Sequence, residues 1–141
     1  MIRIDIPATS ANLGSGFDSL GMALTMCNRV WMEEADELKI TTTDKIKVPT
    51  DETNLIYWAA RHLYQICGKT LPGLHIIQEN NIPMARGLGS SSACIVAGIL
   101  GANRMLGSPM SQSDLINLAA QIEGHPDNTS PAISGGLVAS A

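Results

Sequence analysis

The residues best suited to chemistry form a glycine–serine loop in the middle of the chain. Gly87 and Gly89 allow a tight turn and a close approach of the backbone to a ligand, and three serines follow at positions 90–92. The apolar run at 93–100 is typical of a buried helix. Because the first turn of a helix has unpaired N–H groups and a partial positive charge, we predict that this loop binds a polyphosphate chelated to a metal ion.

The loop differs from the common nucleotide-binding motifs. A P-loop, G-x-x-x-x-G-K-[ST], needs a lysine before its hydroxyl residue, and no lysine follows Lys69. The spacing also differs from G-x-G-x-x-G. Considered alone, G-L-G-S-S-S could be only a turn that caps a core helix, and this structural alternative stays open.

Two further segments combine glycine with polar side chains. Residues 8–21 contain Asn12 and Asp18 among three glycines, which is more polar than a simple connection requires. In the second segment, four polar side chains fall within six residues: Glu123, His125, Asp127 and Asn128. Each segment could also be an ordinary turn in which Asn and Asp bond to their own backbone, so neither assigns a function by itself.

Strands are predicted before and between these segments. Isoleucine alternates with polar residues over 2–6, which predicts a half-buried strand that Pro7 ends. Residues 22–34 and 38–42 are extended in character, and the acidic run at 33–37 predicts a hairpin turn between them. Alternation over 74–78 predicts a strand that leads into the glycine–serine loop.

Helices are predicted at three places. Thr53 or Asn54 can N-cap a helix that Gly68 ends, and His62 within it is predicted to be a surface or packing residue. The apolar positions of this helix are Leu55, Ile56, Ala59, Leu63, Ile66 and Cys67. A second helix is predicted over about 90–105. A third begins with the capping-box pattern at 111–114 and ends near Glu123 and Gly124.

Composition limits the class of protein. The 141 residues are 45% hydrophobic and carry a net charge of −4 without a basic cluster, which predicts one domain that does not bind nucleic acid. No apolar run approaches the length of a membrane span, so we predict no membrane contact. Three separate cysteines without a C-x-x-C motif, Cys27, Cys67 and Cys94, predict reduced core thiols in a cytoplasmic protein. Residues 135–141 resemble the start of a strand, either a natural edge strand or one in a chain cut from a longer protein.

Taken together, the three loops resemble the homoserine kinases, a branch of the GHMP kinase superfamily. The matching motifs are P-A-T-S-A-N-L-G-x-G-F-D-S-x-G at 7–21, P-x-x-x-G-L-G-S-S at 83–91, and E-G-H-P-D-N at 123–128 with a later G-G pair. The motifs occur in the order of the family, and the resemblance spans the chain from residue 2 to 138. Ser15 stands where the family commonly has proline, which is expected to loosen the first loop.

The resemblance implies an α+β fold. Residues 1–141 would form a GHMP kinase N-terminal, ATP-binding domain similar to domain 2 of ribosomal protein S5. The ferredoxin-like C-terminal domain of the family is absent, so the chain is expected to be truncated. The implied reaction transfers the γ-phosphoryl group of ATP to the side-chain hydroxyl of L-homoserine, which gives O-phospho-L-homoserine for threonine biosynthesis.

The resemblance also implies roles for individual residues. The nucleotide-binding positions are Asn54, Pro83, Arg86, Gly87, Leu88, Gly89, Ser90, Ser91 and Ser92. Ser91 and Glu123 would hold Mg²⁺. The pocket for L-homoserine would be lined by Asn12, Asp18, His125 and Asn128. Asp18 is the candidate catalytic residue, because it could pair with the substrate ammonium and orient the hydroxyl in a reaction that depends on positioning more than on a strong base.

Two other interpretations are weighed against this one. Another GHMP kinase, such as mevalonate kinase, would share the glycine–serine loop, although the first and third loops favour an amino-acid substrate. A non-catalytic domain that keeps the S5-like fold could bind a partner such as RNA, although the negative charge argues against RNA. A homodimer is compatible with the sequence, which does not specify an oligomeric state.

Overall fold

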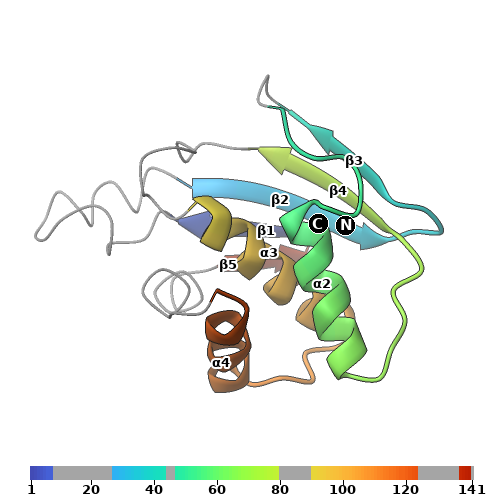
Figure 1. Ribbon diagram of the computed structural model, residues 1–141. Helices are drawn as coiled ribbons and strands as arrows, with labels where there is room; N and C mark the ends of the chain where they lie inside the picture. Colours follow the sequence, from blue (N-terminus) through green and yellow to red (C-terminus); the bar gives the residue numbers. More distant parts are fainter. Residues whose placement is uncertain (8–26, 44–46, 80–89, 124–136, 141) are drawn as a thin grey trace, which may run out of the picture.

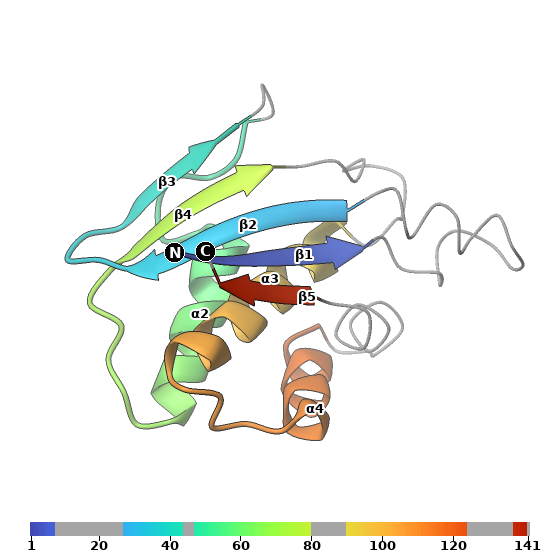
Figure 2. The ribbon, with the colours of Figure 1, turned by 180° about the vertical axis from the view of Figure 1, so that it is seen from behind.

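The computed structural model describes residues 1–7, 27–43, 47–79, 90–123 and 137–140. Over these residues the chain forms a five-stranded mixed sheet in the order β3-β4-β2-β1-β5. Helices α2 and α3 cover one face of this sheet, and α4 packs beside α3 (Figure 1 and, from behind, Figure 2). The predicted α+β class is therefore confirmed.

The predicted strands and helices are present, and residues 22–26 of the predicted second strand lie outside the described residues. In chain order they are β1 (Ile2–Pro7), β2 (Cys27–Glu34), β3 (Lys39–Thr42), α2 (Leu55–Ile66), β4 (Leu74–Glu79), α3 (Ser90–Met105), α4 (Gln112–Glu123) and β5 (Leu137–Ser140). Strand β5 pairs with β1 at the edge of the sheet. Among the described helices, none is both long and apolar enough to cross a membrane.

The predicted hairpin between the second and third strands is wrong, because β4 lies between them. Strand β4 is antiparallel to β2 and parallel to β3. Its alternate residues Leu74, Ile76 and Gln78 are buried, so it takes an interior place, whereas β3 buries only Ile40 and suits an edge. Directly before β4, the backbone at Gly73 packs closely against the backbone of Glu37. A Cβ atom on Gly73 would lie 2.6 Å from it.

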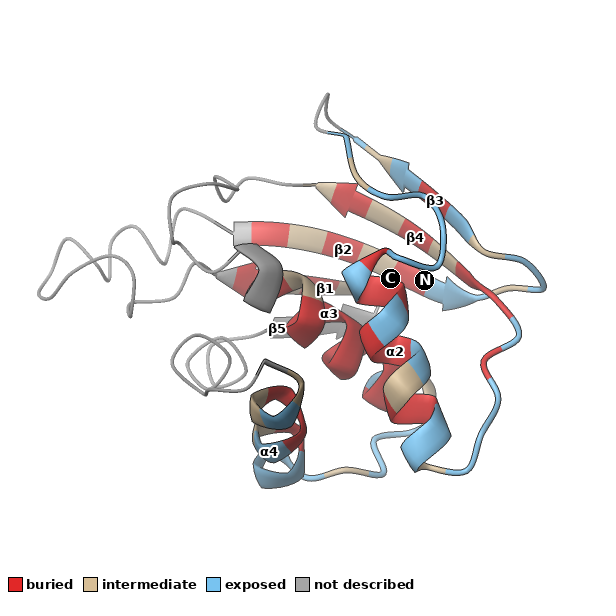
Figure 3. Cartoon of the chain, viewed as in Figure 1, coloured by how far each residue is buried: buried red, intermediate tan, exposed pale blue. Residues whose placement is uncertain are grey.

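The core lies between the sheet and the helices (Figure 3). Helix α3 is buried on most sides, at Ala93, Ile95, Val96, Ala97, Ile99, Leu100 and Ala102. Two of its glycines allow close packing. A Cβ atom on Gly98 would overlap the carbonyl oxygen of Ile56 in α2, and one on Gly101 would overlap the Met32 side chain. These contacts fix α3 against both α2 and the sheet.

Helix α2 buries a face that differs in part from the prediction. Two positions predicted to be apolar contacts, Leu55 and Ile66, are 40% and 54% exposed. Their places on the inner face are taken by tyrosines, of which Tyr64 donates a 2.5 Å hydrogen bond to Glu34 Oε1. On the outer side, His62 stacks on Trp58 with ring centroids 5.3 Å apart, in agreement with the predicted packing role.

Candidate functional site

The described residues that flank the three predicted loops lie at one end of the sheet. The first loop leaves β1 and enters β2, the second leaves β4, and the third enters β5. Antiparallel pairing places the ends of these strands side by side (Figures 1 and 2). The register pairs Pro7 with Cys27, Arg29 with Glu79, and Asp5 with Leu137.

The helices attached to the second and third loops point to the same end. Helix α3 begins at Ser90, as predicted, and α4 ends at Glu123. In both views the start of α3 and the end of α4 lie on the side where the loop-flanking strand ends gather (Figures 1 and 2). The structure therefore brings the first turn of a 16-residue helix and the residue that closes α4 toward one place.

Most of the predicted site residues lie outside the described part of the chain: Asn12, Asp18, Pro83, Arg86, Gly87, Leu88, Gly89, His125 and Asn128. For Ser90, Ser91, Ser92 and Glu123 the backbone position is described and the side chain is not. Their predicted contacts with nucleotide, metal and substrate stay predictions. What the structure adds is the position of their anchoring elements.

Asn54 is the predicted nucleotide-binding residue whose side chain is described. It is 2% exposed and N-caps α2, because its Oδ1 atom accepts hydrogen bonds from the backbone N–H groups of Ile56 at 2.9 Å and Tyr57 at 3.4 Å. Its Nδ2 atom donates to the Pro49 carbonyl at 2.8 Å and to Gln78 Oε1 at 3.0 Å. The amide is thus fully used within the protein.

The bond between Asn54 and Gln78 supports the segment that leads into the glycine–serine loop. Gln78 is 2% exposed and is the penultimate residue of β4, the strand that precedes that loop in the chain. Sequence reasoning placed Gln78 in the strand but did not identify this supporting role. The available signal was a polar residue at an inward-facing strand position, since a buried amide needs a hydrogen-bonding partner.

An ion-pair group joins the strand ends at the candidate site. Arg29 Nη1 lies 2.7 Å from Glu79 Oε2, and Arg29 Nε lies 3.9 Å from Asp5 Oδ1. These residues come from β2, β4 and β1, which carry the first and second loops. Because the Arg29 side chain is 43% exposed, the pairs are expected to contribute little stability, although they connect the ends of three strands.

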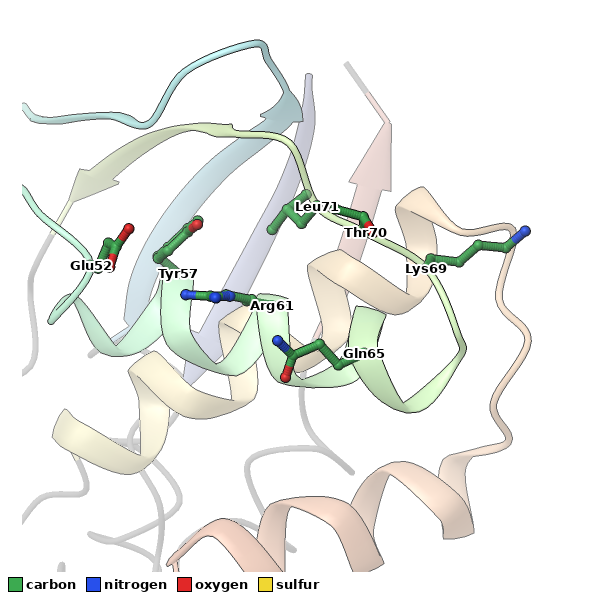
Figure 4. Close-up of a pocket in the computed structure, with 7 residues that line it drawn as sticks. All are labelled: Glu52, Tyr57, Arg61, Gln65, Lys69, Thr70 and Leu71. Atoms are coloured by element: carbon green, nitrogen blue, oxygen red, sulfur yellow. The ribbon is translucent and has the colours of Figure 1, made fainter.

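A separate hollow of about 210 Å³ lies along α2 (Figure 4). None of its seven lining residues is a predicted site residue, and five of the seven are exposed. The lining carries both signs of charge: Glu52, Tyr57, Arg61, Gln65, Lys69, Thr70 and Leu71. We assign the candidate site to the loop-bearing end of the sheet, where a helix N-terminus is present.

The arrangement at this end suits phosphate chemistry. The first N–H groups of a helix have no partners within the helix, and together with the helix dipole they favour an anion at the start of α3. The sequence has a carboxylate residue at the end of α4 and serines at the start of α3, and both residue types contain the oxygen atoms that Mg²⁺ prefers as ligands. The donor set therefore fits a magnesium–polyphosphate complex.

Comparison with known proteins gives consistent matches. The family model described as GHMP kinases N terminal domain matches residues 54–136. A homoserine kinase of Trichodesmium erythraeum is 50% identical over 140 residues, which are 96% of this chain and 46% of that protein. A homoserine kinase from Desulfitobacterium hafniense is 47% identical over 139 residues, which are 97% of this chain and 47% of that protein. The crystal structure of homoserine kinase from Cytophaga hutchinsonii superposes with a TM-score of 0.74 at 25% identity, covering 99% of this chain and 48% of that one.

Proposed function

Because the chain belongs to the family of GHMP kinase N-terminal domains, we propose that residues 1–141 form the ATP-binding domain of a homoserine kinase. The chain spans about half the length of the curated relatives it matches. The activity is therefore proposed for a longer protein, in which a C-terminal domain completes the site. That protein transfers the γ-phosphoryl group of ATP to the side-chain hydroxyl of L-homoserine and releases O-phospho-L-homoserine, an intermediate of threonine biosynthesis.

The observation that carries the proposal is the meeting of three loop anchors at one end of the sheet. Strand register alone brings together the ends of β1, β2, β4 and β5. A phosphoryl-transfer site needs an anion-binding helix start, a metal ligand and groups that hold the acceptor, all in one place. The three loops carry residue types suited to these three tasks.

In this proposal the helix start at α3 holds the phosphates of ATP. Backbone N–H groups near Ser90 and Ser92 bind phosphate oxygens, with the glycine loop at 87–89 allowing close approach. Ser91 and Glu123 hold Mg²⁺, which neutralises negative charge on the phosphates when it is bound. The role of Asn54 is to hold the segment beside the loop through Gln78, and its predicted proximity to the nucleotide is retained.

The acceptor is held by the first and third loops. Asp18 pairs with the substrate ammonium and orients its hydroxyl toward the γ-phosphate, while Asn12, His125 and Asn128 line the rest of the amino-acid pocket. A zwitterionic substrate suits this mixture of a carboxylate and neutral hydrogen-bonding groups. We further propose a cytoplasmic location, in accordance with the separate free thiols, and no role in nucleic-acid binding, in accordance with the net charge of −4.

The substrate assignment is tested with the longer protein in a coupled assay of ADP release. L-homoserine should support turnover and mevalonate should not. Asp18→Asn should lower kcat/KM for homoserine by roughly two to four orders of magnitude, because loss of one partner of a buried charge pair costs about 3–5 kcal/mol. The KM for ATP should change little. Turnover with mevalonate and none with homoserine would overturn the assignment.

The metal assignment is tested by two substitutions at the helix ends. Glu123→Gln should preserve folding, nearly abolish turnover and raise the Mg²⁺ requirement. Ser91→Ala should cause a smaller loss, because a water molecule can replace a hydroxyl ligand. A Glu123→Gln protein with the wild-type rate and the same Mg²⁺ dependence would remove Glu123 from the site.

A further inference from the structure

A buried asparagine clamps the connection between α3 and α4. Asn103 lies in the last turns of α3 and is 7% exposed. Its Oδ1 atom accepts a hydrogen bond from the Met110 backbone N–H at 3.0 Å, and its Nδ2 atom donates to the Met110 carbonyl oxygen at 3.2 Å. One side chain therefore satisfies both backbone groups of a residue seven positions away.

The backbone of the connection is shaped around this clamp. Gly107 and Ser108 adopt left-handed φ angles of 87° and 62°, which turn the chain sharply after α3. The Ser108 N–H donates to the Asn103 carbonyl oxygen at 2.7 Å. Asn103 thus contacts the connection through its backbone and its side chain. A positive φ angle is unfavourable for serine, so the conformation of Ser108 depends on stabilising hydrogen bonds such as the one to Asn103.

Helix α4 packs on the core along one face. Leu115, Leu118 and Ala119 are buried there, Ile116 and Ile122 pack partly against the core, and the first turn at 111–114 is exposed. Helix α3, in contrast, is fixed by close contacts at Gly98 and Gly101. Among the described residues, the clamp is a polar link between helix α3 and the start of the less extensively packed helix α4.

A small rotation at the clamp is large at the other end of α4. The helix has 12 residues. At about 1.5 Å per residue it is about 18 Å long, so a rotation of about 5° near Met110 moves its last residue by about 1.5 Å. Misplacement of a reacting group by about 1 Å can cost about 100-fold in rate. The direction of α4 is thus a sensitive variable for Glu123.

We propose that Asn103 is a positioning residue of the phosphoryl-transfer site. It fixes the direction of α4 relative to α3, and so sets where Glu123 stands relative to the serines at the start of α3. Asn103 itself lies near the end of α3 opposite to Ser90 and is not among the residues proposed to bind ATP or substrate. The inference rests on the proposed function in that Glu123 is taken as a magnesium ligand.

The test substitution is Asn103→Asp in the longer protein, with Ser111→Ala as the matched control. Aspartate keeps the shape and the acceptor for the Met110 N–H but cannot donate to the Met110 carbonyl oxygen. Ser111→Ala removes the N-cap of α4, where the Asp114 N–H donates to Ser111 Oγ at 3.2 Å, and leaves the clamp intact. If Asn103→Asp does not fold at the assay temperature, Asn103→Ser is measured instead.

Two readouts decide the proposal. In the metal-free protein, backbone residual dipolar couplings should show α4 reoriented or averaged relative to α3 in the Asn103 variant and unchanged in the Ser111 control. In the assay, the Asn103 variant should show kcat reduced about 10- to 100-fold and a half-saturating Mg²⁺ concentration raised about tenfold, with the KM for homoserine within twofold of wild type.

The outcomes separate this proposal from the proposed function. Unchanged helix orientation, or an unchanged Mg²⁺ requirement in an active enzyme, would overturn the positioning role of Asn103. A general loss in which the KM for homoserine rises as much as the Mg²⁺ requirement would also overturn it, since that result indicates a merely structural role. Failure of the wild-type protein to phosphorylate homoserine would instead overturn the proposed function, while the dipolar couplings would still decide whether Asn103 sets the direction of α4.

Discussion

Substitution of Gly98 by alanine should separate α2 from α3. A Cβ atom at this position would overlap the carbonyl oxygen of Ile56 and lie 2.9 Å from the Cβ atom of Ala59. The Ile56 oxygen belongs to the backbone and Ala59 has only a methyl side chain, so neither atom can move away by a change of rotamer. Since ordinary contact begins at 3.4 Å and the Ile56 carbonyl oxygen would lie about 1 Å inside that limit, the two helices must separate by about 1 Å.

The expected cost follows from two opposing effects. Overpacking a close-packed helix interface costs about 1–3 kcal/mol, and Gly98 lies at the upper end because the obstacle is backbone. Alanine in place of glycine within a helix gains about 1 kcal/mol. We therefore expect Gly98→Ala to lower the free energy of unfolding by about 2 kcal/mol.

Urea unfolding followed by circular dichroism measures this change, with Gly101→Ala as the control. A Cβ atom on Gly101 would meet the ends of the Met32 and Ile4 side chains, which can change rotamer. The control has the same helix and the same gain in propensity, so it should lose less than about 1 kcal/mol. A Gly98→Ala protein as stable as wild type, or more stable than the Gly101→Ala protein, would refute this account of the α2–α3 interface.

Three further predictions concern polar and thiol groups. Asn54→Ala should lower the free energy of unfolding by about 2–4 kcal/mol in urea titrations, because it removes an N-cap and leaves buried Gln78 without this partner; a loss below about 0.5 kcal/mol would contradict the role of the bridge. Ser111→Ala should cost about 1 kcal/mol in the same titrations, and no loss would mean that the capping box does not stabilise α4. Burial raises the pKa of Cys94 from 9.0 to about 11, so the native thiol should react with iodoacetamide at pH 8 about 100-fold more slowly than in the urea-unfolded chain. The folded chain then retains a proton that the unfolded chain loses, so this contribution to stability is complete below pH 9 and is lost as the pH rises to about 11. Equal alkylation rates in the two states would contradict the burial of this thiol.

Much of the fold could be predicted because its signals are local. Alternation over 2–6 and 74–78 predicts β1 and β4, because alternate side chains are buried: Ile4 and Ile6 in β1, and Leu74, Ile76 and Gln78 in β4. The N-cap at Asn54 and the capping box at Ser111 are likewise set by residues within one turn. The resemblance to the GHMP kinases is confirmed by the match over residues 54–136.

The order of the strands could not be predicted from local signals. The acidic run at 33–37 predicts a turn between β2 and β3, but a turn alone does not determine whether these two strands pair with each other. Strand β4 is more apolar on its inner face than β3, and its burial decides the order. The wrong positions in α2 have a similar cause, since Tyr57 and Tyr64 cover the core in place of Leu55 and Ile66.

The supporting contacts of the candidate site were also beyond the sequence. The bridge between Asn54 and Gln78 spans 24 residues, and the clamp between Asn103 and Met110 depends on an unusual turn. Neither pattern has a periodicity that a sequence window can detect. The functional prediction depended on three motifs and their family resemblance, whereas the structure contributed the common end at which their anchors meet.

The convergence of the three loops on one magnesium–ATP site is tested most directly by paramagnetic broadening of amide signals. Mn²⁺-ATP would be added to the isotope-labelled longer protein, with Mg²⁺-ATP as the diamagnetic reference. The start of α3 at Ser90 and the turn at Gly107 are separated by a helix of 16 residues, or about 24 Å. We predict that the amide signals of Ser90, Ser91 and Glu123 broaden while those of Gly107 and Ser108 stay sharp. Equal or stronger broadening at Gly107 and Ser108 would contradict it.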